Sequence, residues 1–140
     1  MKYLFMIFSA ACLAVACKKD LTSETTQTDK VDSSAIAKTS ARFINGPYGT
    51  VTGHARVFKT LANKYIVQLD SFNTNNGPDL QVYLSREIMP VNFVNLGKLK
   101  STNGSQTYEV PDSILNLMQY KYVCIHCRAF NHLFGYANIY

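Results

Sequence analysis

The feature that most constrains this chain is the run Tyr120–Cys127, which is made almost entirely of aromatic, β-branched, cysteine and histidine residues. This composition predicts a pleated and largely buried strand at the centre of a sheet. Neighbouring side chains of a strand point to opposite faces, so Cys124 and His126 should share one face while Cys127 lies on the other. The reactive side chains of this strand are therefore expected to lie in two different environments, one on each face of the sheet.

The same geometry limits what the two cysteines can do together. In an extended strand their Cα atoms lie about 10 Å apart, too far for a disulfide or a shared metal unless the strand ends between them. A thioredoxin-type pair would need a helix to begin after the first cysteine, and Ile125-His126 is a poor helix start. The chain has no Cys-x-x-Cys-His string, which excludes covalent c-type haem.

Other segments alternate apolar and polar residues with the period of two that a half-buried strand requires. They are Val51–Val57, Tyr65–Asp70 and Leu80–Leu84. Several short strands separated by turn residues predict an all-β fold, an antiparallel β-sandwich of the immunoglobulin type. Its core is expected to contain Val51, Val57, Val67, Leu69, Leu80, Val82, Leu84, Val123 and Ile125.

Two local features follow the third of these segments. The pair Asn103-Gly104 is a hairpin-turn signal, so residues 96–100 and 106–110 should form a hairpin. Residues 111–115 are typical of a short helical turn that covers one end of the sheet. Two residues are possible N-caps of this turn, Asp112 and Ser113.

Composition supports a single domain and excludes one class of partner. A chain of 140 residues that is 47% hydrophobic can bury one core but hardly two. The net charge of +5 comes from 14 scattered Lys and Arg residues that form no basic stripe. No nucleic-acid-binding motif is present, so we expect no nucleic acid as a partner.

The first residues have the pattern of an export signal. Lys2 is followed by an apolar run that ends in small residues, which is typical of a cleaved leader rather than a spanning helix. Leu13–Cys17 resembles a bacterial lipobox, so residues 1–16 are predicted to be removed and Cys17 to be acylated. Cys12 is a weaker candidate, and an ordinary signal cleavage site is the alternative. Multiple acyl chains on Cys17 would hold the protein stably on a lipid bilayer.

Residues 17–42 are predicted to form a polar tether between the anchor and a domain over 43–140. Residues 21–34 contain almost no large apolar side chain and cannot offset the entropy cost of ordering. Residues 35–43 are expected to form a helical turn or two. The string 18–20, Lys-Lys-Asp, resembles the export tag of Bacteroidetes lipoproteins, which places the protein in the cell envelope, at the periplasmic or exposed face of the outer membrane.

Four strings of the predicted domain carry a family resemblance. They are Gly77-Pro78-Asp79-Leu80-Gln81-Val82-Tyr83-Leu84, Leu96-Gly97-Lys98-Leu99-Lys100, Cys127-Arg128-Ala129-Phe130 and Leu133-Phe134-Gly135-Tyr136-Ala137. Together they resemble the DM-thirteen domain family, the electron-transfer-associated relatives of the DOMON domains. The resemblance implies a DOMON-like β-sandwich over about 43–140. His126 stands where the family often has tryptophan.

The resemblance makes Cys127 the redox candidate, because the family's near-invariant cysteine falls there. Arg128 beside it would favour the thiolate, which can bind a soft metal or be oxidised. Copper or haem is a conceivable cofactor, with His132 as the better second ligand and His126 the poorer one because it faces the other way. A redox partner protein is then expected. Other motif positions have structural roles: Gly77, Pro78, Asp79, Tyr83, Phe130 and Gly135.

Two alternatives stay open. Cys127 can equally be a small buried apolar residue. The domain would then be a surface binding or adhesion module that contacts glycan or protein through tyrosines such as Tyr48, Tyr83, Tyr136 and Tyr140. Hydrolase motifs are absent from the sequence, so the protein is expected not to be an enzyme of that class.

Overall fold

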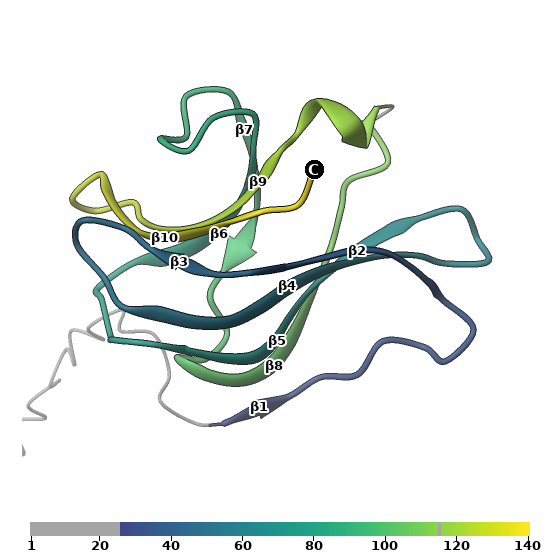
Figure 1. The fold of residues 1–140 in the computed structure, drawn as a ribbon, viewed down its shortest axis with the longest axis horizontal. Coiled ribbons are helices and arrows are strands. Elements are labelled where there is room, and N and C mark those ends of the chain that lie inside the picture. The colour runs from purple at the N-terminus through teal and green to yellow at the C-terminus, as the bar shows by residue number, and fades with distance from the viewer. Residues whose placement is uncertain (1–25, 115) are drawn as a thin grey trace, which may run out of the picture.

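The computed structural model describes residues 26–114 and 116–140. In these residues the chain forms two five-stranded sheets that pack face to face (Figure 1). Sheet A has the strand order β1-β8-β5-β4-β2. Its strands are β1 (Gln27–Thr28), β8 (Asn103–Glu109), β5 (Tyr65–Thr74), β4 (Val51–Lys59) and β2 (Ile36–Arg42).

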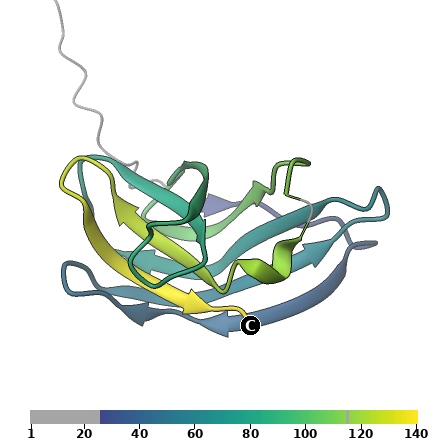
Figure 2. The same cartoon turned by 90° about the horizontal axis from the view of Figure 1, so that it is seen from above.

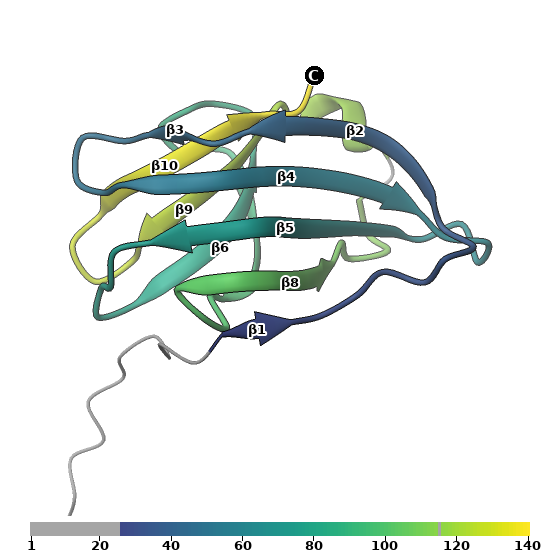
Figure 3. The same ribbon diagram turned by 60° about the horizontal axis from the view of Figure 1, so that its bottom comes forward.

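Sheet B has the order β3-β10-β9-β6-β7. Its strands are β3 (Ile44–Asn45), β10 (His132–Asn138), β9 (Tyr122–Cys127), β6 (Leu80–Ser85) and β7 (Phe93–Lys98). The view from above looks onto sheet B with strands of sheet A behind it (Figure 2), and the turned view shows the strands of sheet A side by side in front of sheet B (Figure 3). This is the predicted β-sandwich, although it has more strands than the sequence indicated.

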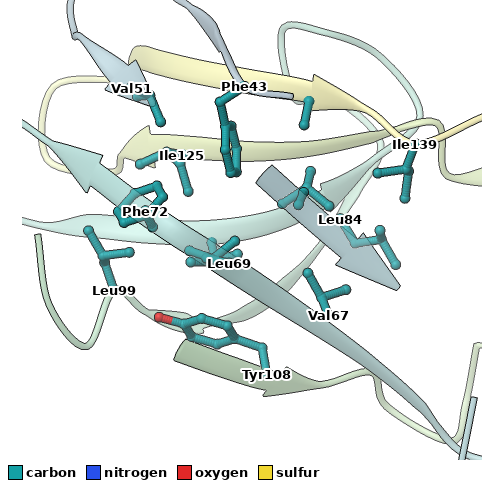
Figure 4. Close-up of a cluster of buried hydrophobic side chains, with 14 of the residues drawn as sticks. Phe43, Val51, Val67, Leu69, Phe72, Leu84, Leu99, Tyr108, Ile125 and Ile139 are labelled. Carbon is teal, nitrogen blue, oxygen red and sulfur yellow. The ribbon is translucent and has the colours of Figure 1, made fainter. Parts of the chain in front are cut away.

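The core lies between the sheets and contains all nine residues predicted for it. Figure 4 shows side chains of both sheets meeting there, with Leu69 and Val67 of sheet A facing Leu84 and Ile125 of sheet B. Phe43 and Phe72 pack edge to face, with ring centroids 5.6 Å apart. The sequence predicted these buried faces because a period of two is a local property of an extended chain.

Strand β9 is the central strand of sheet B, as predicted. It pairs antiparallel with β6 on one side and β10 on the other. Ile125 and Cys127 belong to the core cluster, whereas Cys124 belongs to a small second cluster on the face turned away from sheet A. We call this face the outer face of sheet B. The predicted division of the two cysteines between opposite faces is therefore confirmed.

The predicted hairpin over residues 96–110 is wrong. Strand β7 pairs with β6 in sheet B, whereas β8 pairs with β5 in sheet A, so the chain crosses between the sheets after Lys98. Gly104 lies in β8 at a φ of 97° and packs against the backbone of Gln27. Its positive φ therefore serves a close approach of β1 and not a two-residue turn.

The N-terminal part of the sandwich begins earlier than predicted. Residues 36–42 form β2 and pair with β4, so the predicted helical turns over 35–43 are wrong. Pairing with an open sheet edge overrides the weak helical preference of this segment. Within the predicted tether, Gln27–Thr28 pairs with β8 and Asp29 binds Lys100 and Thr107. Residues 1–25, with the leader and Cys17, lie outside the described residues.

The predicted helical turn at 111–115 is also displaced. Residues 111–114 form a turn closed by the Ile114 amide and the Pro111 carbonyl. The helical turn is η1 (Leu117–Gln119), with Asn116 as N-cap, since its side chain accepts a hydrogen bond from the Met118 amide. Within the described residues, the structure contains no helix long and apolar enough to cross a membrane.

Candidate functional site

The β9–β10 turn brings most of the predicted site residues to one end of sheet B. Cys127 ends β9, His132 begins β10, and Phe130 lies in the turn between them. Asp79 immediately precedes β6, whose first residue, Leu80, is the ladder partner of Cys127. Motif strings that are separated in sequence by about fifty residues therefore meet because β6 and β9 are neighbours (Figure 1).

An ion pair joins the two motif strings. The Arg128 Nε donates to Asp79 Oδ2 at 2.7 Å, and the Arg128 amide donates to the Asp79 carbonyl at 3.0 Å. The side chain of Gln81 also donates to Asp79. Desolvation opposes ionisation of Asp79, but the hydrogen bonds from Arg128 and Gln81 and the charges of Arg128 and Lys98 together lower its pKa below 3.8.

This arrangement sets the roles of both charged residues. Asp79 was expected to have a structural role, and its carboxylate holds two side chains. Arg128 was predicted to favour a thiolate at Cys127, and its charge is engaged by Asp79. The physical reason is that Arg128 lies in the turn that follows β9, where its backbone amide also binds the carbonyl of Asp79.

Cys127 is buried between the sheets. It is a free thiol with 1% of its surface exposed and belongs to the main core cluster. Its position at the last residue of β9 places it at the rim of the core and not at the middle. A thiol in such apolar surroundings packs as a small hydrophobic residue, and reagents reach it only when the strand end opens.

His132 is the ladder partner of Cys127 across the β9–β10 hairpin. Directly opposed residues of an antiparallel pair point to the same face, with Cβ atoms about 4.5–5.5 Å apart. The pairing of Cys127 with His132 as joint ligands thus fits the backbone. The ring of His132 stacks on Tyr48, with centroids 3.8 Å apart, and lies 5.8 Å from the ring of Phe130.

The outer face of sheet B carries a second thiol that the sequence did not single out as a ligand. Cys124 is fully buried between its ladder partners Tyr83 and Tyr136. Its Sγ lies 3.5 Å from the carbonyl oxygen of Ile88, so the β6–β7 loop covers it. Burial raises the pKa of the Cys124 thiol to about 12, which keeps it protonated at neutral pH.

His126 lies on the same outer face and is 4% exposed. Neither ring nitrogen has a hydrogen-bond partner of good geometry among the described residues. Its ladder partners are Leu133, which is apolar, and Gln81, whose amide binds Asp79 and Asn95. Buried polar atoms without partners cost free energy, so a ring with two of them is unusual.

Burial lowers the pKa of His126 below 6.5, and the nearby positive charge of His132 acts in the same direction. The Asn131 side chain approaches the ring closely enough to oppose this effect, but it makes no hydrogen bond of good geometry with either nitrogen. The neutral form of the imidazole is therefore favoured. This form has one N–H donor and one acceptor nitrogen, and neither makes a hydrogen bond of good geometry with a described residue.

Tyr83 is buried and not an exposed contact residue, which corrects the sequence-based expectation. It is 3% exposed, and its ring stacks on Phe93 at 4.2 Å and on His126 at 5.2 Å. Burial raises the pKa of Tyr83 above 10; the charge of Arg128 opposes this, and that of Asp79 adds to it. Tyr48 and Tyr140 are exposed as predicted, with 54% and 46% of their surface accessible.

The motif glycines have packing roles that the structure explains. A Cβ on Gly77 would lie 2.8 Å from a methyl group of Leu80 and 3.1 Å from the Phe134 ring. A Cβ on Gly135 would lie 2.6 Å from a methyl group of Val51 in sheet A. These glycines let the strands and the 77–79 turn, which contains Pro78, approach closely at this end of the sandwich.

Two methionines, whose thioethers could also bind a soft metal, lie away from Cys127. Met118 is 70% exposed in η1, at the other end of β9 from Cys127. Met89 is exposed in the β6–β7 loop. Among residues 26–114 and 116–140, no three His, Cys, Asp or Glu side chains come together in a group that would hold a metal ion.

Sheet A also carries a hollow that sequence reasoning did not predict. It has a volume of about 630 Å³ and is lined by Arg42, His54, Arg56 and Asp70, beside the bulge at Gly53. Arg56 pairs with Asp70 at 2.9 Å. The sequence signal that marks the hollow is the row of polar residues in register across β2, β4 and β5.

These observations define an antiparallel β-sandwich with buried free thiols on both faces of its central strand. The family model for Electron transfer DM13 matches residues 42–139. The chain belongs to the DM13 electron transfer family. A search of curated proteins and a search of solved structures found no match.

Proposed function

We propose that this protein is a lipid-anchored protein of the cell envelope whose DM13 domain takes part in electron transfer, with Cys127 as the redox group. The observation that carries the proposal is the place of Cys127, a free thiol at the end of the central strand with His132 directly opposite. Membership of the electron transfer family supports the redox class.

The sulfur of Cys127 has two routes to such a role, and they make different demands. As a thiolate it would ligate a soft metal together with the imidazole of His132, which lies on the same face. As a thiol it would be oxidised directly, which requires the β9–β10 turn to open because the side chain is 1% exposed. Burial favours ligation, since a bound metal exchanges electrons without exposing the sulfur.

The anchor supports the same setting. The lipobox-like Leu13–Cys17 would place acyl chains on Cys17, and residues 18–25 would connect the bilayer to the sandwich. A redox partner would be another protein at the same membrane. A Cys17→Ala variant is expected to leave the membrane fraction; if it stays there with its leader removed, the anchor assignment is wrong.

The redox proposal is tested by the visible absorption spectrum and metal content of the purified protein before and after a mild reductant. A reductant-sensitive band or a stoichiometric metal should disappear in Cys127→Ala and weaken in His132→Phe. Cys124→Ala is the matched control for the absorption band: it removes a buried thiol from the same strand but from the other face, so the reductant-sensitive band should persist in it. A colourless, metal-free wild-type protein with an inert Cys127 contradicts the proposal.

That negative result would favour the second candidate function, a binding module without chemistry. One observation supports it, the exposed aromatic group beside the β9–β10 turn. Tyr48 and Phe130 are 54% and 62% exposed, and both contact the ring of His132. Such a platform suits the apolar faces of sugar rings, and Tyr48→Ala would then reduce retention on glycan arrays.

A further inference from the structure

The outer face of sheet B carries a thiol and an imidazole on one strand, both of them buried. Cys124 and His126 are separated by one residue of β9, so both side chains point away from sheet A. Cys124 is fully buried and His126 is 4% exposed. The ring of Tyr83 connects them, as the ladder partner of Cys124 and the stacking partner of His126.

His126 supplies the observation that points to a ligand. Both of its ring nitrogens are buried, and neither makes a hydrogen bond of good geometry with a described residue, although the Asn131 side chain lies near the ring. The polar side chain across from it, Gln81, is already used by Asp79 and Asn95. Burying an imidazole in this state costs free energy that a bound ligand would offset. Among the described residues, the Cys124 thiol has one hydrogen bond, a weak one to the Ile88 carbonyl.

We propose that Cys124 and His126 form a two-coordinate site for a monovalent soft metal ion, Cu(I). The proposal is independent of the redox role of Cys127, which lies on the other face of the strand. Thiolate and imidazole are the donors that copper favours. Zinc would require four ligands, and the described residues offer no group of three or more.

Strand geometry allows the coordination. Residues i and i+2 of a strand have Cα atoms about 6.5–7 Å apart. A linear sulfur–metal–nitrogen unit spans roughly 4.3 Å, taking metal–sulfur and metal–nitrogen bonds of about 2.3 and 2.0 Å. Two side chains that lean toward each other along the strand cover the difference.

Charge balance selects a monovalent ion. Cu(I) displaces the thiol proton of Cys124, so one sulfur–copper bond and one nitrogen–copper bond form while one proton leaves to solvent. The bound unit of thiolate, neutral imidazole and Cu(I) carries no net charge, and copper keeps its oxidation state. A divalent ion would leave one uncompensated positive charge in a buried site, which is far costlier.

The loop that covers Cys124 is the route by which Cu(I) would enter the site. Residues 86–92 lie between β6 and β7, and the Ile88 carbonyl contacts the thiol. Ile88, Met89 and Val91 are 38%, 46% and 76% exposed, so opening this loop disturbs little buried apolar surface. Copper entry therefore requires a local opening and leaves the core intact.

The test uses the full chain in detergent with Cys12→Ser and Cys17→Ser, so that Cys124 and Cys127 are its remaining thiols. The protein is titrated anaerobically with Cu(I) against a chromophoric Cu(I) chelator. We expect Cys127→Ala to bind one Cu(I) per chain, and this binding to be lost when Cys124→Ala or His126→Phe is added to it. Asn138→Ala, at an exposed position of β10, is the control and should bind as the parent does.

The X-ray absorption spectrum of copper-loaded Cys127→Ala should show one sulfur and one nitrogen donor, and Cys124 is the remaining thiol of that protein. If Cys124→Ala or His126→Phe fails to fold, this measurement still decides the proposal. Failure of the parent to compete with the chelator overturns the inference, as does a spectrum with two sulfur donors. Binding that survives Cys124→Ala but is lost in Cys127→Ala also overturns it, and would instead support the site proposed for Cys127.

Discussion

The two faces of β9 present the same chemistry, a cysteine near a histidine, in two different ways. On the core face, Cys127 packs between the sheets, and its histidine comes from the next strand and stacks on exposed aromatic rings. On the outer face, Cys124 shares its strand with a buried histidine and is covered by a loop. Apolar packing between the sheets surrounds Cys127 on the core face. On the outer face, the distinguishing feature is the pair of His126 ring nitrogens that make no hydrogen bond of good geometry with a described residue.

This difference shows that burial alone does not identify a functional thiol. Both cysteines have 1% or less of their surface exposed. The informative feature is the neighbouring histidine. Both histidine rings stack on a tyrosine, but His126 also has two buried nitrogens without a hydrogen-bond partner of good geometry among the described residues. The core face should therefore carry more of the stability, and the outer face more of the response to pH and metal.

The largest expected effect tests the core face. Ile125→Ala removes a fully buried side chain between Cys124 and Cys127 and should lower the free energy of unfolding by about 3–4 kcal/mol, through lost burial and the cavity left behind. Urea unfolding followed by circular dichroism measures it. Cys124→Ala, on the outer face, should cost about 1 kcal/mol. Equal losses in the two variants would contradict the assignment of the core.

Overpacking the same face should have the next largest effect. Gly135 is the ladder partner of Ile125, and a Cβ there would lie 2.6 Å from a methyl group of Val51 and 2.9 Å from the Ile44 carbonyl. Gly135→Ala should cost about 1–3 kcal/mol of unfolding free energy. Asn138→Ala, at an exposed position of β10, is the control. A neutral Gly135→Ala would mean that the sheets are less closely packed at this end.

The outer face should make stability depend on pH. Burial lowers the pKa of His126 below 6.5, so below this pH the unfolded chain binds a proton at His126 more readily than the native protein does. The contribution of His126 to the free energy of unfolding is therefore largest above about pH 6.5. It falls as the pH decreases, by at most about 1.4 kcal/mol per pH unit. Urea unfolding between about pH 7.5 and 5.5 measures this slope.

The histidine variants identify the source of that slope. His126→Phe keeps an aromatic ring beside Tyr83 and should flatten it, because the group that titrates is gone. His132→Phe, on the other face, should reduce it much less, because it removes only the smaller effect of the His132 charge and leaves the burial of His126 unchanged. A slope that persists in His126→Phe and disappears in His132→Phe would reverse the comparison between the faces.

The smallest effect concerns the rim of the core face. Asp79→Asn removes the ion pair with Arg128, whose side chain is 64% exposed, and should cost less than about 1 kcal/mol. It should nevertheless loosen the β9–β10 turn, so Cys127 is expected to react faster with an alkylating reagent while Cys124 does not. Mass spectrometry of the labelled peptides measures both rates. Equal acceleration would show that the thiols are exposed by the same global opening.

Sequence periodicity predicted the parts of the fold that depend on one strand at a time. The burial of Val67, Leu69 and Ile125 and the opposite directions of Cys124 and Cys127 all follow from the alternation of side chains along an extended chain. The motif strings also led to the correct family. The hairpin predicted from Asn103-Gly104 was wrong, because the positive φ of Gly104 allows a close contact with the backbone of Gln27 and does not form a two-residue turn.

The site was only partly predictable. The sequence placed His132 as the better partner of Cys127, and the ladder register supports that choice. It missed Cys124 with His126 as a pair, although their spacing on one strand face was visible, because no sequence signal shows what covers a sheet. It also assigned Arg128 to a thiolate, whereas the carboxylate of Asp79, in the turn before β6, binds it.

By itself, then, the sequence determined which residues are extended, which face of each strand is apolar, and which family the domain belongs to. The tertiary structure decided that β7 and β8 enter different sheets, that residues 36–42 complete sheet A, and that a loop closes over Cys124. The physical reason is the range of the interactions. Side-chain alternation is set by the local backbone, whereas strand pairing and burial depend on contacts between residues far apart in the chain.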